Sequence, residues 1–171
     1  MARILGSIDN AAIWSTQYHL IFTETAVFQF ELMSGKDWRK EMFYTQMSNP
    51  MRMVPVAGEV SSIQIGREES ERMIEQDAAQ GKEIEQNFDK IVSEGTAKFT
   101  KIEYGDINYV ELSNGTPLSL PHLILQTKPE KLKFHLIRNS YKGKGSLPED
   151  VFSSYANTLK QAFGDSVKIK G

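Results

Sequence analysis

The sequence contains no cysteine, so disulfide frameworks, thiolate nucleophiles and cysteine-ligated metals are excluded. It also has no apolar run long enough to form a membrane-spanning helix. A basic excess is missing too: 20 basic side chains oppose 22 acidic ones, for a net charge of −2, so no nucleic-acid partner is expected. The N-terminal stretch is too polar for a secretory signal, so we expect a cytoplasmic location.

The remaining composition is that of an ordinary globular domain. The hydrophobic share is 40% and the charged share is 25% over 171 residues, which fits a single domain spanning residues 1–171. Aromatic and β-branched residues concentrate over residues 18–23 and 26–32. The Glu24-Thr25 pair between these two runs is suited to a tight turn, so the pattern predicts a β-hairpin.

Residues 33–97 differ in character and are expected to form a mostly helical insertion. Five of the seven methionines lie between residues 33 and 53. Further along, apolar residues recur every three or four positions, which is typical of an amphipathic helix. Gly81 interrupts this helix and predicts a break or a close approach of the backbone. The apolar stripe is a weak candidate for a partner surface, through Ile84, Phe88 and Ile91.

Strand patterns return after residue 98, and a well-defined helix follows them. We expect four strands, at residues 99–104, 107–112, 122–127 and 131–138. The sequence Ser146-Leu-Pro-Glu149 resembles a capping box, and an apolar stripe follows it to Phe163. The pattern predicts a helix over residues 147–163 that covers the sheet or the mouth of a barrel.

Alternate residues of a strand point to the same face. If the stretch KIEYGDINYVELSNG, residues 101–115, formed one continuous strand, Asp106 would therefore point to its buried face. A buried, unpaired carboxylate is costly, so two strands that meet at a corner are expected instead. Gly105 permits the bend, and Asp106 is expected to cap the corner by accepting backbone amides.

Three segments resemble the prokaryotic pleckstrin-homology-like (PH-like) domains. They are Tyr18-His-Leu-Ile-Phe-Thr-Glu-Thr-Ala-Val27, Ile102-Glu-Tyr-Gly-Asp-Ile-Asn-Tyr-Val-Glu-Leu112 and Leu132-Lys-Phe-His-Leu136. The resemblance implies a mainly β fold: an antiparallel barrel or sandwich of about seven strands, capped by the C-terminal amphipathic helix. Members of that fold bind lipids or peptides or act in assemblies, so the resemblance does not name a ligand. The loop that binds phosphoinositides in the family has no basic residue here.

A basic zone is the main candidate for a binding surface. It comprises Lys128, Lys131, Lys133, Arg138, Lys142 and Lys144. One interpretation is a solubilising edge strand, on which lysine blocks unwanted pairing. The other is a weak site for an anionic ligand or an anionic membrane.

No enzymatic constellation is recognised in the sequence. The three histidines, at positions 19, 122 and 135, have no metal-site spacing, and His135 is expected to be solvated. Lys142-Gly-Lys-Gly145 is too short for a phosphate loop. We therefore expect a non-enzymatic binding or assembly module with no cofactor and no metal. Its partner is either a second copy of the chain, which would make a homo-oligomer, or another protein; the alternative is recruitment to an anionic membrane.

Overall fold

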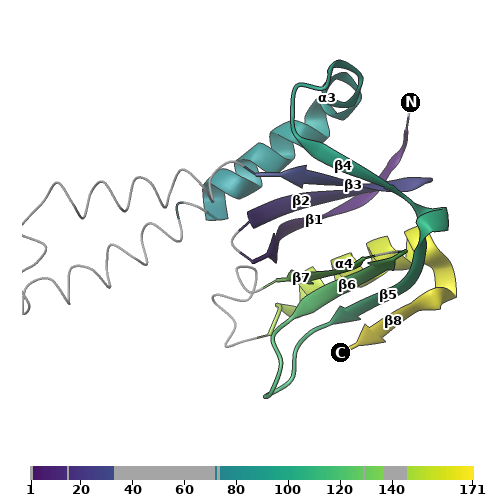
Figure 1. Cartoon of the computed structure of the whole chain (residues 1–171). Coiled ribbons are helices and arrows are strands. Elements are labelled where there is room, and N and C mark those ends of the chain that lie inside the picture. The colour runs from purple at the N-terminus through teal and green to yellow at the C-terminus, as the bar shows by residue number, and fades with distance from the viewer. Residues whose placement is uncertain (1, 15, 33–71, 73, 129, 137–145) are drawn as a thin grey trace, which may run out of the picture.

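The computed structural model describes residues 2–14, 16–32, 72, 74–128, 130–136 and 146–171 (Figure 1). The strands are β1 (Ile4–Ile13), β2 (Thr16–Thr23), β3 (Ala26–Glu31), β4 (Phe99–Glu103), β5 (Ile107–Ser113), β6 (His122–Thr127), β7 (Lys131–His135) and β8 (Val167–Lys170). They form one sheet in the order β4-β3-β2-β1-β7-β6-β5-β8. All neighbouring strands are antiparallel except β5 and β8, which run parallel. The six strands predicted by residue range are present as β2–β7, and β1 and β8 are additional.

The sheet divides into two halves that pack face to face. β1 and β7 are joined by a single residue pair, Ala12 with His135, and this weak seam separates β1–β4 from β5–β8. One hydrophobic cluster contains buried side chains from both halves, including Phe22 and Leu123. The ring of Tyr18 meets the ring of Phe134 edge to face at 6.0 Å across the interface. The predicted mainly β fold is therefore confirmed, as a sandwich-like arrangement and not a closed barrel.

The C-terminal helix α4 (Glu149–Phe163) is the predicted cap, and it packs against the same cluster through Tyr155 and Leu159. It ends at the short 3-10 turn η4 (Gly164–Ser166), which leads into β8. The predicted capping box does not form, because Pro148 is the N-cap residue and no side chain caps the helix. The backbone before the helix is held instead by Asn114, whose Oδ1 accepts the Leu147 N–H at 2.7 Å.

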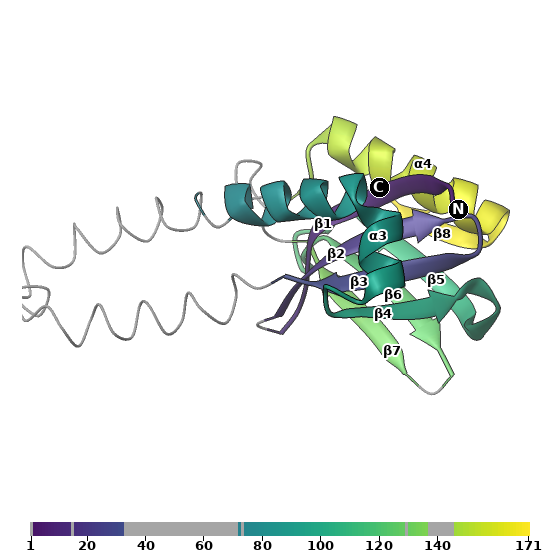
Figure 2. The same ribbon diagram turned by 90° about the horizontal axis from the view of Figure 1, so that it is seen from above.

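A second helical layer covers the outer face of β1–β4. Residues 74–86 are helical, a turn follows at Asn87, and α3 (Phe88–Glu94) continues the layer (Figure 2). A second hydrophobic cluster joins this layer to the sheet, with Phe88 against Phe28 at 4.9 Å. The described part of the predicted 33–97 insertion is thus helical. Residues 33–71 and 73, which include the methionine-rich segment, lie outside the described residues.

The predicted corner at Gly105-Asp106 is present as a 3-10 turn, η2 (Tyr104–Asp106), between β4 and β5. Asp106 is exposed and makes no side-chain cap within the described residues, so its predicted capping role is wrong. Tyr104 holds the corner instead. Its hydroxyl donates to the Thr23 carbonyl, its N–H donates to the Thr25 carbonyl at 3.2 Å, and its ring packs on Phe163 at 4.7 Å.

Replacing Tyr104 with phenylalanine is expected to lower the free energy of unfolding by about 1 kcal/mol, because the carbonyl of the buried Thr23 loses its donor. Burial raises the pKa of Tyr104, so the hydroxyl keeps its proton throughout the usual pH range. Urea unfolding followed by circular dichroism measures the effect. Asp106→Asn is the matched control and is expected to change stability by less than about 0.5 kcal/mol. A larger loss in Asp106→Asn than in Tyr104→Phe would restore the capping role of Asp106.

Candidate functional site

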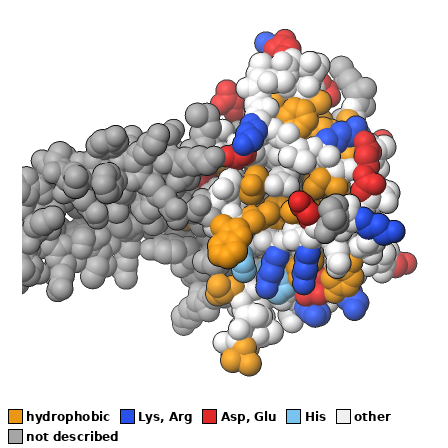
Figure 3. All heavy atoms as spheres, in the orientation of Figure 1, with side chains coloured by type: hydrophobic (Ala, Val, Ile, Leu, Met, Phe, Trp, Pro, Cys, Tyr) orange, Lys and Arg blue, Asp and Glu red, His pale blue; other side chains and the backbone are white. Residues whose placement is uncertain are grey.

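The outer face of β5–β8 carries a cluster of lysines, which we name the basic face: Lys131, Lys133, Lys168 and Lys170. All four are exposed. Strand register places them on one surface, because Lys133 pairs with Ile124, Ile124 with Glu111, and Glu111 with Lys168. These paired residues form one row across the strands. Lys131 lies in the neighbouring row on one side of it, and Lys170 lies in the neighbouring row on the other side. Figure 3 shows basic side chains gathered over the part of the molecule where β5–β8 lie in Figure 1.

A buried carboxylate, Glu111, lies at the centre of the basic face. It accepts a hydrogen bond from the Tyr109 hydroxyl, and its Oε1 lies 3.3 Å from His122 Nε2 and 3.4 Å from Lys170 Nζ. The Tyr109 hydroxyl, followed by His122 and Lys170, keeps the pKa of Glu111 below its ordinary value, against the opposing effect of burial. Glu111 therefore stays ionised and neutralises part of the charge, mainly that of Lys170.

Lys168 is placed over an aromatic ring, with its Nζ 5.4 Å from the centroid of Tyr109. Within the described part of the chain, no carboxylate forms an ion pair with Lys131, Lys133 or Lys168. These three charges are available to an anionic partner. A surface of this kind attracts acidic groups through its field, and the attraction weakens as salt is added.

The basic face includes only part of the basic zone predicted from the sequence. Lys131 and Lys133 belong to it, and Lys128 is exposed just after β6. Arg138, Lys142 and Lys144 lie outside the described residues. β7 pairs with β6 over its whole length but with β1 only at His135, so its other edge is not covered by β1 at Lys131 and Lys133, and the interpretation as a solubilising edge strand stays a prediction.

Sequence reasoning missed Lys168 and Lys170. The signal was present in Val167-Lys-Ile-Lys170, where apolar and basic residues alternate as they do in a strand with one buried face. The apolar members of this segment pack on the core, so the lysines point outward. Only the parallel pairing of β8 with β5 shows that they join the lysines of β7.

The predicted partner surface on the helical insertion is not exposed. Ile84 and Phe88 are buried in the second hydrophobic cluster, and Ile91 is half-buried against it. The apolar stripe of this layer packs on the outer face of the chain's own sheet, so it cannot serve as a seam for a second copy. The prediction of a partner surface at these three residues is therefore wrong.

His19 lies beneath this helical layer and joins it to the sheet. Its side chain is only 1% exposed; Nδ1 lies 2.6 Å from an Asp9 carboxylate oxygen, and Nε2 lies 2.8 Å from Glu85 Oε1. Burial alone would lower the pKa of His19, but the hydrogen bonds and charges of Asp9 and Glu85 outweigh burial and raise it to about 9. With both ring nitrogens held by carboxylates, the imidazolium is a structural cation and has no free nitrogen to act as a base.

The other histidines are also enclosed by the protein. His122 is buried, and its Nδ1 lies 2.9 Å from the Leu120 carbonyl oxygen. His135, which was predicted to be solvated, is half-buried, and burial followed by Lys133 and His122 lowers its pKa. Among the described residues, no group of His, Asp and Glu is arranged to hold a metal ion.

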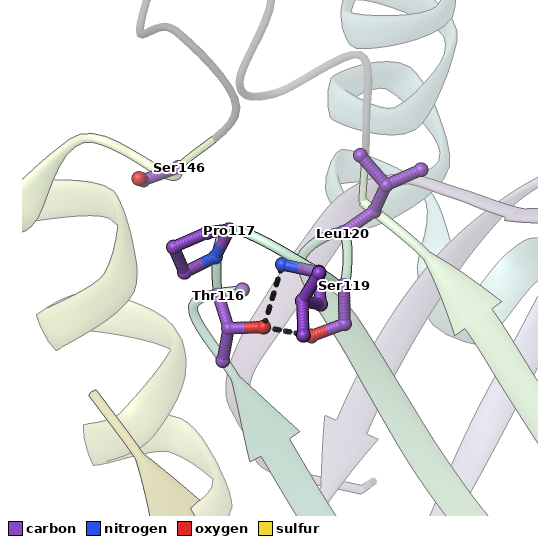
Figure 4. A pocket seen from close by; sticks show the side chains of 7 residues that line it. Thr116, Pro117, Ser119, Leu120 and Ser146 are labelled. Carbon is purple, nitrogen blue, oxygen red and sulfur yellow. Dashed lines mark hydrogen bonds between the residues drawn. The ribbon is translucent and has the colours of Figure 1, made fainter.

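A shallow cavity of about 470 Å³ is formed by the loop over residues 115–120 and by Ser146 (Figure 4). Two of its hydroxyl groups are already paired with each other, since Thr116 Oγ1 and Ser119 Oγ lie 2.9 Å apart, and the Leu118 N–H donates to Thr116 Oγ1. The cavity therefore presents few unpaired polar groups to a ligand. The basic face is the stronger candidate site.

All four lysines of the basic face lie in the C-terminal part of the chain, which is also the part that matches a family model. Residues 119–171 match a family model described as Oligosaccharyltransferase Peripheral 2 domain. The match covers less than half of the chain. No curated protein and no solved structure matches the chain significantly.

This match overturns the resemblance to prokaryotic PH-like domains. Two of the elements on which that resemblance rested, residues 132–136 and the helix over 147–163, fall within the segment that matches the Oligosaccharyltransferase Peripheral 2 domain. The short motifs describe alternating strands and a capped helix, which many mainly β folds share, so they could not distinguish one family from another. In the part of the chain that the structure describes, no helix is both long and apolar enough to span a membrane.

Proposed function

We propose that this chain is a non-enzymatic binding module of a protein assembly and that it docks on acidic protein surfaces through the basic face. The observation that carries the proposal is that residues 119–171, which match the Oligosaccharyltransferase Peripheral 2 domain, contain all four lysines of that face. A peripheral domain of an oligosaccharyltransferase is by its name an accessory part of a larger system. We infer an accessory role of the same kind for this chain.

A non-enzymatic role is supported by two buried ionisable side chains, His19 and Glu111, which are already engaged by other residues of the protein. His19 is held by two carboxylates, and Glu111 is held by Tyr109, His122 and Lys170. Each group already has its partners within the protein, so neither is positioned to move a proton on a substrate.

A second copy of the chain is the partner that we propose, through the carboxylates of its helical layer. The exposed surface of the helical layer carries four carboxylates, against the lysines at positions 82 and 90 and Arg72; the carboxylates are Glu75, Glu83, Asp89 and Glu94. This layer covers the outer face of β1–β4, whereas the basic face is the outer face of β5–β8 (Figure 1). Four carboxylates against three cations leave this layer with a net charge of only −1, so we propose that its individual carboxylates, and not a broad acidic field, meet the lysines. Because the two halves of the sheet pack face to face, the helical layer and the basic face lie on opposite sides of the molecule.

Carboxylates on one side and lysines on the other are compatible with head-to-tail contacts, in which the basic face of one copy meets the helical layer of the next. Such contacts depend on charge and are therefore expected to weaken with salt. The weak candidate surface predicted from the sequence, the apolar stripe of the helix, would instead have formed contacts that tolerate salt.

Light scattering after size exclusion is the test. At low ionic strength and high protein concentration, we expect the molar mass to rise above the 19.4 kDa of one chain and to fall back as salt is added. The double variant Lys131→Gln/Lys168→Gln is expected to weaken association by at least tenfold, which corresponds to about 1.4 kcal/mol. The matched control, Arg3→Gln/Lys160→Gln, removes the same charge elsewhere and is expected to associate as the natural chain does.

Two results would contradict the proposal of self-association. One is a molar mass of one chain at every concentration and at every salt level. The other is an equal loss of association in the basic-face variant and in the control variant, which would attribute the effect to net charge alone.

A further inference from the structure

An exposed tryptophan lies beside the basic face. β1 and β7 meet at one antiparallel pair, Ala12 with His135, so the chain beyond Ala12 turns back along β7. Trp14 and Lys133 are each two residues from this pair, one on either strand. Trp14 belongs to the turn between β1 and β2 and is 95% exposed. The turn therefore presents a large apolar side chain at the border of the basic face, and Figure 3 shows hydrophobic side chains next to histidine and basic ones on this side of the molecule.

Trp14 adopts a backbone conformation that disfavours it. Its φ is +55°, in the left-handed region that residues other than Gly, Asn and Asp rarely adopt. Turns that connect two hairpin strands favour Asn or Gly at such positions. The indole ring gains little by packing on the rest of the chain, because almost all of its surface is exposed. Folding alone does not account for a tryptophan in this turn, whereas a role in binding does.

The basic face itself has little apolar surface to offer a partner. In the row formed by Lys133, Ile124, Glu111 and Lys168, the apolar member, Ile124, is only 6% exposed. An exposed ion pair strengthens an interaction by about fivefold or less, and charges act mainly on the rate and orientation of association. Most of the affinity of a protein interface comes from a few large side chains, among which tryptophan is enriched. The lysines alone are therefore a weak basis for a stable contact.

A second exposed apolar side chain, Leu118, lies away from these lysines. It is 98% exposed and belongs to the loop over residues 114–121 between β5 and β6. This loop leaves the sheet at the end of β6 that pairs with His135, whereas Lys133 and Lys131 pair with residues of β6 progressively further from the loop. Leu118 is as exposed as Trp14 but extends in the other direction, so it provides a matched control.

We propose that Trp14 is the apolar anchor of the contact made by the basic face, and that it packs on the helical layer of a second copy of the chain. This inference rests on the proposed self-association and adds to it a side chain outside the basic face. The lysines beside Trp14 attract the carboxylates of the helical layer, and the indole leaves water as the contact forms. Charge then determines the orientation and the salt dependence of the contact, while Trp14 supplies much of its affinity.

Fluorescence and light scattering on the same samples test the proposal. The chain has two tryptophans, so Trp38→Phe leaves Trp14 as the only one. As the protein concentration rises at low ionic strength, we expect the Trp14 emission to shift to the blue in step with the rise in molar mass. Added salt is expected to reverse both changes together.

Variants separate the anchor from the charges. Trp14→Asn suits the positive φ, so the melting temperature is expected to be kept or raised while association weakens by about tenfold or more. The association that remains is expected to keep the salt dependence of the natural chain, because every lysine is retained, whereas Lys131→Gln/Lys168→Gln is expected to reduce that dependence. Leu118→Asn removes an equally exposed apolar side chain and is expected to associate as the natural chain does.

Three outcomes would overturn this inference and leave the proposed self-association standing. They are association without a shift of the Trp14 emission, full association by Trp14→Asn, and an equal loss in Trp14→Asn and Leu118→Asn. A blue shift that appears only with vesicles of phosphatidylcholine and phosphatidylglycerol, and not with rising protein concentration, would overturn the choice of partner and assign Trp14 to a bilayer. A molar mass of one chain under every condition would instead contradict the self-association itself.

Discussion

Replacing His19 with alanine is expected to lower the free energy of unfolding by about 3–5 kcal/mol, the usual cost of breaking a buried ion pair by removing one partner. The imidazolium links Asp9 on β1 to Glu85 on the helical layer, and its loss removes the cation that pairs with both carboxylates. The variant also leaves a cavity beside Gly81, because the ring is buried against the helix backbone. Urea unfolding at pH 7 measures the loss.

The same ion triad predicts a pH dependence with a definite sign. The pKa of His19 is about 9 in the folded protein and 6.5 without its partners, so folding favours the protonated ring. Its contribution is fully present below pH 6.5 and is lost as pH rises through 9. The difference between these pKa values corresponds to about 3 kcal/mol. Unfolding free energies measured between pH 6 and pH 10 are therefore expected to fall in the natural chain and to stay nearly flat in His19→Ala over the same range.

His135→Asn is the control for this pH dependence. The pKa of His135 is lowered in the folded protein, so any stability linked to its titration changes at acidic pH and not between pH 7 and pH 9. The control is expected to keep the alkaline slope of the natural chain. An unchanged alkaline slope in His19→Ala would show that His19 does not carry the positive charge assigned to it.

Much of the fold could be predicted because its signals are local. Alternation over residues 131–135 predicted β7, and the apolar stripe up to Phe163 predicted α4. The corner at Gly105-Asp106 followed from the cost of burying a carboxylate in a continuous strand. Its stabilising residue was missed, because Tyr104 acts through Thr23 and Phe163, both of them distant in the sequence.

The candidate site was only partly predictable for the same reason. The alternation of Lys131 and Lys133 is visible in the sequence, but Lys168 reaches them only through the parallel pairing of β8 with β5. The stripe containing Ile84 showed that one face of the helix is apolar, and periodicity does not tell whether the chain's own sheet or a partner covers such a face. The ion triad of His19 joins residues 10 positions and 66 positions apart, and no local pattern marks it.

Gly81→Ala is expected to destabilise the protein by about 1–3 kcal/mol, the cost of overpacking a close contact. In an ordinary helix this change would be favourable by about 1 kcal/mol, because alanine is the better helix former. Here a Cβ at position 81 would lie 2.5 Å from His19 Nδ1 and 2.7 Å from its Cε1. The imidazole cannot move aside without weakening its contacts to Asp9 and Glu85, so the helix must shift away from the sheet.

Two comparisons isolate this contact. Gly105→Ala is the matched control, because a Cβ at position 105 meets no atom within 4 Å, and a change of less than about 0.5 kcal/mol is expected. In the double variant Gly81→Ala/His19→Ala the added methyl group fills space that the ring vacates, so its cost is expected to be less than the sum of the two single changes. Additive effects would mean that the helix does not approach His19 as closely as described. A coupled result would also bear on assembly, since the same contact holds the helical layer on the side of the molecule opposite the basic face.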